Sequence, residues 1–451
     1  MKIAIIGSGI TGLSAAWLLH PHHQIVVYEQ DGRIGGHSNT VDAPVGPDGA
    51  SVPVDTGFIV FNGRTYPNLV ALFDHLGVLA ADTAMSFSVS SRNGALEYAG
   101  TSMRHLYAQP RNLLRWRHHR MVRDILDFYR RAPGLLAEMD DDQDSPSLEA
   151  FLSAHGYGDG FVYDHLLPMG AAIWSTTVSE MMRFPATSFV RFFHNHGLLQ
   201  VAGRPQWRTV KGGSRSYVKR LAGSFADRIR TGDGAVEITR AGPCAVVKDS
   251  TGHAEIFDQV ILACHADQAL ALLTDATDEE RAVLTPFRYE PNKAVLHTDP
   301  KLMPRRRRVW SSWNYLSRQP TVDDAKVSVT YWMNRLQPLG TARDVFVTLN
   351  PLREPDPRSV IASFDYDHPQ FDHAAMLAQK RIGSIQGVNR TWFCGSYCGY
   401  GFHEDGLAAG LTVAEALGAR RPWSVEEASP AGRHAAPDIP FVPDALRIAA
   451  E

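Results

Sequence analysis

Short runs of β-branched residues at the start of the chain flank one helix-like segment. Lys2 to Ile6 reads KIAII and Gln24 to Glu29 reads QIVVYE. Continuous apolar runs of this length are typical of strands buried on both faces of a parallel sheet. The segment from Ile10 to His20 between them has the composition of a helix, and Ala15 is small enough to pack closely on such a sheet. The pattern predicts strand, tight turn, helix and strand.

Further along the chain, other apolar runs predict more strands. Residues 235–238 and 259–263 are strand candidates, and residues 290–350 alternate apolar and polar positions as in an antiparallel sheet. Residues 392–394 predict another buried strand, which is followed by a glycine-rich turn and a helix that ends near Leu417.

A basic segment interrupts these runs at residues 104–131. It holds eight arginines against Asp124 and Asp127, while Met121 and Ile125 belong to apolar positions that recur at helical spacing. We expect a basic amphipathic helix. Its apolar stripe either rests on an anionic membrane surface or packs on the protein, with the arginines then facing water or pairing with the acidic residues 138–144.

Composition narrows the class of protein. A net charge of -3 argues against a nucleic-acid-binding protein. No apolar run reaches the roughly 18 residues that a membrane span needs, and the N-terminus lacks a signal-peptide cleavage site. We therefore expect a cytoplasmic protein that can touch the inner membrane face. The four cysteines are too scattered for a disulfide scaffold, and neither Cys394 with Cys398 nor His194 with His196 completes a metal site, so we expect no metal.

The turn after the first strand carries the strongest chemical signal. It reads Gly7-Ser8-Gly9-Ile10-Thr11-Gly12. The first glycine permits a tight turn, the second lets backbone approach a pyrophosphate, and the third lets helix and strand pack closely. Phosphates then lie at the helix N-terminus, where free N–H groups favour negative charge. Glu29 ends the next strand and can accept hydrogen bonds from a ribose hydroxyl. This is a Rossmann-type fingerprint for an ADP-containing cofactor.

Later glycines favour FAD over NAD. Gly35-Gly36-His37 and Asp55-Thr56-Gly57 offer further close approaches that a longer cofactor needs. Gly395-Ser396 and residues 399–406 (GYGFHEDG) add a C-terminal turn before a helix whose N-terminus can stabilise charge on a reduced flavin.

These motifs resemble the flavin amine oxidase and phytoene desaturase superfamily. Residues 207–215 (WRTVKGGSR), 168–175 (PMGAAIWS) and 401–406 (GFHEDG) are similar to a bacterial branch, often encoded beside cyclopropane-fatty-acid-synthase-like methyltransferases, that includes furan fatty-acid desaturases. The similarity extends to about residue 420.

The resemblance implies FAD contacts at several positions. Val236 is expected to hold the adenine through its backbone, and Lys293 lies on a strand where amine oxidases place a lysine near flavin N5. His37 stands where amine oxidases usually have arginine, and Ser396 where they tend to have an acid. The remaining implied contacts are Gly7, Ser8, Gly9, Ile10, Thr11, Gly12, Glu29, Gly36, His37, Gly57, Gly395, Ser396, Asp405 and Gly406.

The expected fold is α/β, a Rossmann-type FAD-binding domain with a discontinuous α+β substrate domain. The chain alternates between the two because cofactor motifs lie at both ends and in the middle. The boundaries expected are 1–75, 205–270 and 385–421 for the FAD domain, 76–204 and 271–384 for the substrate domain, and 422–451 for an extended tail.

The expected function is desaturation or double-bond isomerisation of a fatty acyl chain, on phospholipid or fatty acid, with hydride transfer to flavin N5. FAD is expected to be bound without a covalent link. Candidate catalytic residues are Lys293, Tyr400, His403 and Glu404, of which the last three precede the flavin-facing helix. The alternatives are an amine oxidase and a non-catalytic FAD-binding protein.

Overall fold

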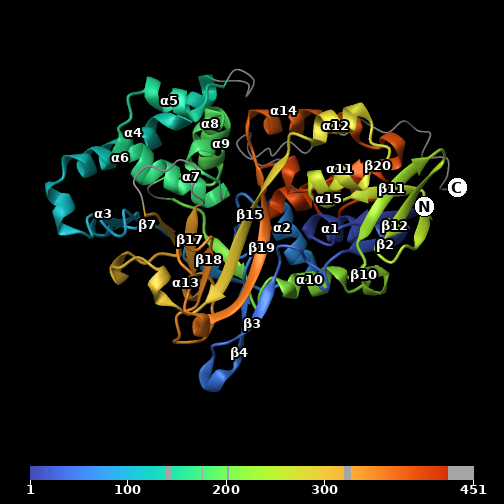
Figure 1. Ribbon diagram of the computed structural model, residues 1–451, viewed down its shortest axis with the longest axis horizontal. Helices are drawn as coiled ribbons and strands as arrows, with labels where there is room; N and C mark the ends of the chain where they lie inside the picture. The colour runs from blue at the N-terminus through green and yellow to red at the C-terminus, as the bar shows by residue number, and fades with distance from the viewer. Residues whose placement is uncertain (139–144, 175, 201–202, 319–326, 425–451) are drawn as a thin grey trace.

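The computed structural model describes residues 1–138, 145–174, 176–200, 203–318 and 327–424 (Figure 1). Most of the expected C-terminal tail, from residue 425, and the acidic residues 139–144 lie outside this description. In the described part no helix is both long and apolar enough to cross a membrane.

A five-stranded parallel sheet holds the two ends and the middle of the chain together. Its strand order is β10-β2-β1-β14-β20. The predicted strands at the N-terminus appear at their predicted residues, because uninterrupted apolar runs suit a sheet that is covered on both faces. The strands are β1 (Lys2–Ile6), β2 (Gln24–Glu29), β10 (Ile229–Thr231), β14 (Gln259–Leu262) and β20 (Thr391–Phe393).

Helix α1 (Ile10–Leu19) packs on this sheet and contacts α15 (His403–Ala416) along its length. The approach is close, because a Cβ added at Gly410 of α15 would lie 2.4 Å from the Thr11 carbonyl oxygen. Helices α10 (Arg215–Ala222) and α2 (Pro67–Leu76) extend this helical layer. A small antiparallel sheet packs against β1 and β14; its strands are β11 (Ala235–Ala241), β12 (Cys244–Asp249) and β13 (Ala254–Phe257).

A seven-stranded sheet forms the second half of the molecule, with strand order β19-β15-β18-β17-β16-β7-β8. All neighbours are antiparallel except β16 and β7. The two long strands β15 and β19 run through the centre of the molecule in Figure 1. The strands are β7 (Phe87–Ser91), β8 (Leu96–Ala99), β15 (Arg288–His297), β16 (Trp313–Leu316), β17 (Ser328–Trp332), β18 (Phe346–Leu349) and β19 (Val360–Gln370).

Smaller elements complete the chain. A two-stranded and a three-stranded sheet consist of β3 (Thr40–Pro44), β4 (Ser51–Asp55), β5 (Phe61–Asn62), β6 (Ala80–Thr83) and β9 (Trp207–Val210). The remaining helices are α3 (Met103–Leu106), α4 (Trp116–Glu138), α5 (Leu148–Ala154), α6 (Asp159–Phe161), α7 (Leu167–Trp174), α8 (Val178–Arg183), α9 (Ala186–Asn195), α11 (Ala266–Leu272), α12 (Asp278–Leu284), α13 (Met333–Leu336) and α14 (His373–Arg381).

The basic segment differs from the predicted single helix. Residues 103–114 form two short helical turns, and the long helix begins only at Trp116. Of the predicted apolar stripe, Met121 and Ile125 are buried in the core of the second half, whereas Leu114, which precedes the long helix, is 91% exposed. The part of the stripe on the long helix therefore packs on the protein.

Candidate functional site

A cavity of about 760 Å³ runs from the carboxyl end of β1 to the strands β16 and β17 of the second sheet. Backbone and side chains from both halves of the molecule line it. Ligands of α/β proteins bind outside the carboxyl ends of parallel strands, and this cavity begins there.

The glycine turn shapes the first end of the cavity. Gly7 has a φ of +102°, and a Cβ there would lie 2.8 Å from the Ala263 carbonyl oxygen. A Cβ at Gly12 would lie 1.9 Å from the Gly7 carbonyl oxygen, so only glycine lets α1 start this close to the turn. Gly9, which lines the cavity, has no protein atom within 4 Å of its Cβ position. Its free side is therefore open to a ligand.

The N-terminus of α1 directly follows the glycine turn. No side chain caps it, and its first turn has no acidic residue. Free N–H groups at a helix N-terminus bind phosphate groups. A glycine cradle with an uncapped helix behind it fits a pyrophosphate.

Glu29 closes the other side of the turn. One carboxylate oxygen accepts hydrogen bonds from the Ser8 N–H at 3.0 Å and from the Ser8 hydroxyl at 2.5 Å. The second oxygen accepts from the Asp31 N–H at 2.9 Å. Glu29 lines the cavity and Ser8 lies behind it, so Ser8 positions the carboxylate. Gly234, Ala235 and Val236 line the same end, where the sequence places the adenine.

The backbone is also closely packed at Gly36 and Gly57. A Cβ at Gly57 would lie 2.2 Å from the His37 carbonyl oxygen, and one at Gly36 would lie 3.2 Å from Gly9 Cα. Arg33 donates from Nη1 to the Gly36 carbonyl oxygen at 2.7 Å and lines the cavity. The Arg33 guanidinium therefore supplies a positive charge near the turn, although position 37 holds histidine where amine oxidases usually have arginine.

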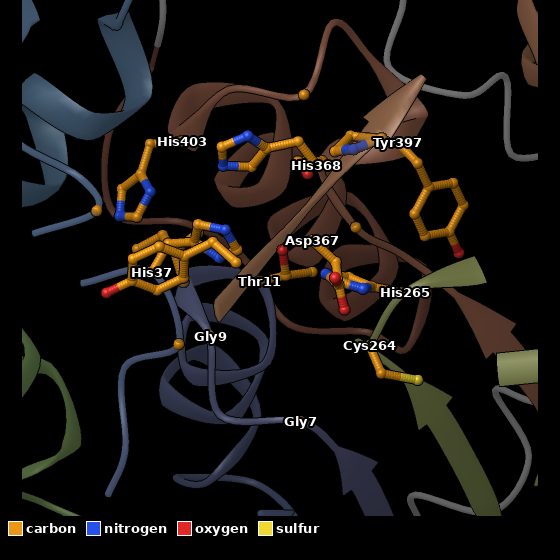
Figure 2. A pocket seen from close by; sticks show the side chains of 18 of the residues that line it. Gly7, Gly9, Thr11, His37, Cys264, His265, Asp367, His368, Tyr397 and His403 are labelled. Atoms are coloured by element: carbon orange, nitrogen blue, oxygen red, sulfur yellow. The ribbon is translucent and has the colours of Figure 1, made fainter. Parts of the chain in front are cut away.

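Four histidines, at positions 37, 265, 368 and 403, surround the middle of the cavity (Figure 2). The rings of His37 and His368 are 5.6 Å apart. Burial lowers the pKa of His368 to about 4 and holds the pKa of His37 well below its ordinary value, with the other histidines and Arg33 adding to the effect at His37. These imidazoles are neutral near pH 7 in the protein alone.

His403 opens helix α15 and is held in place by a polar network. Its Nε2 lies 2.6 Å from the Tyr217 hydroxyl and 3.1 Å from the Ser38 hydroxyl. Its ring stacks on Phe58 at 3.8 Å, and burial lowers its pKa to about 3. Both His403 and Tyr400 line the cavity.

The turn before α15 shapes the cavity wall. Gly395 and Ser396 line the cavity, and the Asp405 carboxylate accepts hydrogen bonds from the N–H groups of Tyr400 and Phe402 at 3.1 and 2.8 Å. A Cβ at Gly406 would lie 2.7 Å from the Thr11 hydroxyl oxygen. Asp405 and Gly406 thus hold the turn against α1 and do not themselves line the cavity.

Glu404 has a structural place. Its buried carboxylate accepts hydrogen bonds from the N–H groups of Asn68 and Leu69, at 2.8 and 2.9 Å, in the first turn of α2. It is not among the residues that line the cavity. Glu404, a catalytic candidate from the sequence, here satisfies the orphan donors of a helix N-terminus, and such an acid stabilises the helix.

Lys293 also lies away from the cavity. Its side chain is 45% exposed, and Nζ lies 3.1 Å from the Glu354 carboxylate. On the same strand the neighbouring Ala294 is buried in the core, because successive side chains alternate between faces. Lys293 thus has the position of a surface lysine on a strand and does not line the cavity.

The far end of the cavity is rich in aromatic rings. Trp313 and Tyr331 meet edge to face at 4.9 Å, and the Trp174 ring lies 4.5 Å from Phe192. Helix α7, β9, β16 and β17 contribute only apolar or aromatic residues to the lining. The lining residues at this end are Ile173, Trp174, Trp207, Trp313, Tyr331, Phe371, Tyr400 and Phe402.

Several lining residues were missed from the sequence. His265 lies three residues after the end of β14, and its place beyond the carboxyl end of a parallel strand was a usable signal. Asp367 and His368 gave none, because β19 meets the turn only through the tertiary fold. Arg33 lies two residues before Gly35, so its closeness to that glycine pair was a usable signal. Figure 2 shows Asp367 beside Thr11 and His265.

The glycine cradle, Glu29 and the C-terminal turn are the features of an FAD-binding α/β enzyme. Residues 10–342 match the family model for flavin containing amine oxidoreductases, and the chain belongs to this family. It is therefore an oxidoreductase with FAD as its cofactor, rather than a non-catalytic binding protein.

Solved structures share the fold over most of the chain. A CLA-producing fatty acid isomerase from P. acnes is 13% identical with a TM-score of 0.63, over 92% of this chain and 97% of that chain. Wild-type putrescine oxidase bound to putrescine is 16% identical (TM-score 0.64; 92% and 98%), and cyclohexylamine oxidase from Brevibacterium oxydans is 15% identical (0.64; 92% and 99%). A comparison with curated protein sequences gave no match.

Proposed function

We propose that this flavoenzyme oxidises or isomerises a fatty acyl chain, supplied as free acid or membrane phospholipid. The observation that carries the proposal is the aromatic end of the cavity. An acyl chain is apolar along its length, and burying it against such a wall is favourable by about 25 cal/mol for each Å² removed from water.

The residues of the turn hold FAD in this proposal. The backbone from Gly7 to Gly12 and the N-terminus of α1 bind the pyrophosphate, Glu29 accepts from the ribose, and Val236 contacts the adenine. Ile10, Thr11, Gly36, His37, Gly57, Gly395 and Ser396 border the path between the two ends of the cavity. Bound FAD supplies a two-electron acceptor for hydride.

His403 and Tyr400 border the substrate end. Because His403 has a pKa of about 3, it is a poor base near pH 7 and acts as a fixed, neutral hydrogen-bonding group. A substrate bound against the aromatic wall would displace water from this end, and polar contacts are stronger where water is displaced. The chemistry at an unactivated carbon is then left to the cofactor.

The neighbours support two substrate classes. The fatty acid isomerase shows that this fold has been used on fatty acids, and the two oxidases are named for amines. The acidic residues that line the cavity lie on or just after β2 and on β19; they are Glu29, Asp31, Asp365 and Asp367. None of them belongs to α7, β9, β16 or β17, which form the aromatic end. This distribution favours an apolar chain over a cationic amine at that end.

An anaerobic titration separates the classes. The FAD-bound protein is mixed with oleate, linoleate or dioleoylphosphatidylglycerol, and separately with putrescine or cyclohexylamine. We expect flavin bleaching, or a product with a new or displaced double bond by gas chromatography, only with the acyl compounds. Reaction with amines alone, or with neither class, would overturn the proposal.

Two tryptophans provide a matched pair for the acyl assay. Trp313 lines the cavity, whereas Trp310, three residues earlier, does not and donates to the Pro304 carbonyl oxygen. Trp313→Leu should raise KM for the acyl substrate about tenfold or more with FAD retained, and Trp310→Leu should leave KM unchanged. Equal changes in KM in the two variants would show that the aromatic lining does not bind the acyl substrate.

A further inference from the structure

Large apolar side chains are displayed to solvent where the basic segment begins. Leu114 is 91% exposed, Trp116 73%, Met103 61% and Leu113 56%. We call residues 103–116 the tip. Single exposed apolar residues are ordinary on protein surfaces, but a cluster of this kind marks a contact with another apolar phase.

The tip is a built structure that holds these side chains outward. His118 and His119 place their Nε2 atoms 3.0 and 2.8 Å from the carbonyl oxygens of Leu106 and Leu113. The Tyr107 hydroxyl lies 2.9 Å from His119 Nδ1. These three polar side chains therefore fix the backbone of the tip, while its large apolar side chains face solvent.

Positive charge accompanies the apolar side chains. Arg104, Arg111 and Arg115 are exposed, and within the described part of the chain none of them forms an ion pair. The arginines further along α4 differ: Arg117 pairs with Asp164, and Arg130 with Asp127. Net positive charge is thus concentrated on the tip.

The tip also projects. In Figure 1 α3 lies at the extreme left of the molecule, at the end farthest from the strands of the parallel sheet. A flat surface can reach it without touching the FAD-binding half. Since the apolar stripe of α4 is buried in the core, the tip is the part of the basic segment that is left to make an outside contact.

We propose that the tip docks on an anionic lipid bilayer. Leu113, Leu114 and Trp116 enter the interface between headgroups and acyl chains, where tryptophan is enriched in membrane proteins. Arg104, Arg111 and Arg115 lie against lipid phosphates, and salt weakens this attraction. The docking does not depend on which substrate reacts at the flavin.

Flotation with lipid vesicles tests the proposal on the FAD-bound protein. Wild type should float at low salt with vesicles of phosphatidylglycerol and phosphatidylcholine, and much less with phosphatidylcholine alone. The double variant Leu113→Ser, Leu114→Ser should have a vesicle partition coefficient about tenfold or more below that of wild type at every salt concentration. Arg104→Gln with Arg115→Gln should lower binding and flatten its salt dependence. Arg111 is left unchanged because its guanidinium donates to the Ala95 carbonyl oxygen.

Leu79 provides the matched control, since it is 67% exposed on another part of the surface. Leu79→Ser should float like wild type, and all variants should keep the flavin spectrum and the melting temperature. Failure of wild type to float, equal flotation of the leucine variant, or equal loss in Leu79→Ser would overturn the proposal. A tip-dependent dimer in sedimentation without vesicle binding would overturn it too, in favour of a second copy. Turnover of soluble free acid tests the acyl proposal separately.

Discussion

At the scale of single residues, Glu29 carries two duties that the sequence motif does not separate. It accepts hydrogen bonds from Ser8 and Asp31 within the protein, and it faces the cavity where a ribose would lie. We expect Glu29→Ala to weaken FAD binding tenfold to a hundredfold, because a hydrogen bond to a charged group contributes about 1.5–3 kcal/mol. Titration of flavin-free protein with FAD, followed by fluorescence, measures the change.

Two further variants test whether the effect on FAD affinity comes from the Glu29 carboxylate itself. Glu29→Gln keeps the shape of the side chain and one hydrogen-bond acceptor, so its FAD affinity should lie between that of wild type and that of Glu29→Ala. Glu149→Ala removes an exposed acid on α5 and should leave FAD affinity unchanged. An unaltered Kd in Glu29→Ala would refute the ribose contact.

The cysteines near the site are poor nucleophiles. Burial raises the pKa of both Cys264 and Cys398 to about 12, so each stays a thiol, and only Cys264 lines the cavity. Since the thiolate is the reactive form, we expect no covalent flavin link. Acid precipitation should leave the yellow flavin in the supernatant, and a pellet that keeps its flavin absorbance would contradict this expectation.

At the scale of elements, α1 can be tested separately as a ligand site and as a packing element. A Cβ at Gly9 meets no protein atom, whereas one at Gly410 lies 2.4 Å from the Thr11 carbonyl oxygen. Gly9→Ala should keep the melting temperature of flavin-free protein and reduce FAD affinity at least about tenfold by blocking the pyrophosphate. Gly410→Ala should destabilise the flavin-free protein by about 1–3 kcal/mol, because it forces α15 away from α1. Thermal unfolding and FAD titration of both variants check this, and identical behaviour would contradict it.

The elements that the sequence predicted well are those governed by local pattern. The strand–turn–helix at Lys2–Leu19 is readable because each glycine and each apolar residue has one task. The stripe of α4 was ambiguous, since helical spacing looks the same whether the partner is lipid or core. The burial of Met121 and Ile125 decides between them for the long helix.

The two catalytic candidates that do not line the cavity depend on register and distant partners. Lys293 pairs with Asp365 across β15 and β19, and a shift of one residue would have turned it to the opposite face. Glu404 is occupied by the first turn of α2, more than 300 positions away in the chain. Neither the strand register nor the distant partner can be predicted from the local sequence. The position of His368 at the cavity could not be predicted for the same reason.

At the scale of the whole molecule, two hydrophobic cores lie on either side of the cavity, one around the parallel sheet and one around the seven-stranded sheet. Parallel strands and glycines dominate the first, and aromatic rings and long strands the second. The cofactor motifs therefore lie against one core and the aromatic lining against the other, so a single cavity at their boundary combines a glycine turn with an apolar wall.

The second core should make the protein sensitive to acid. Burial lowers the pKa of His165 to about 3 and of His297 to about 4, and neither side chain is accessible to solvent beyond a few per cent. Unfolded, each imidazole titrates near 6.5, so between that pH and the folded pKa the unfolded state binds more protons. Stability is then full above pH 6.5 and falls as the pH drops, by about 2 kcal/mol for each histidine at pH 5.

Urea unfolding of flavin-free protein at pH 7 and pH 5 measures this loss. Burial raises the pKa of Asp55 to about 6, and that group opposes the trend because the folded state holds its proton longer. A comparison with the double variant His165→Gln, His297→Gln removes this contribution, since Asp55 is common to both proteins. Wild type should lose about 4 kcal/mol more than the variant between the two pH values. Equal losses would mean that these imidazoles take up protons in the folded protein, and that the second core opens to water before it unfolds.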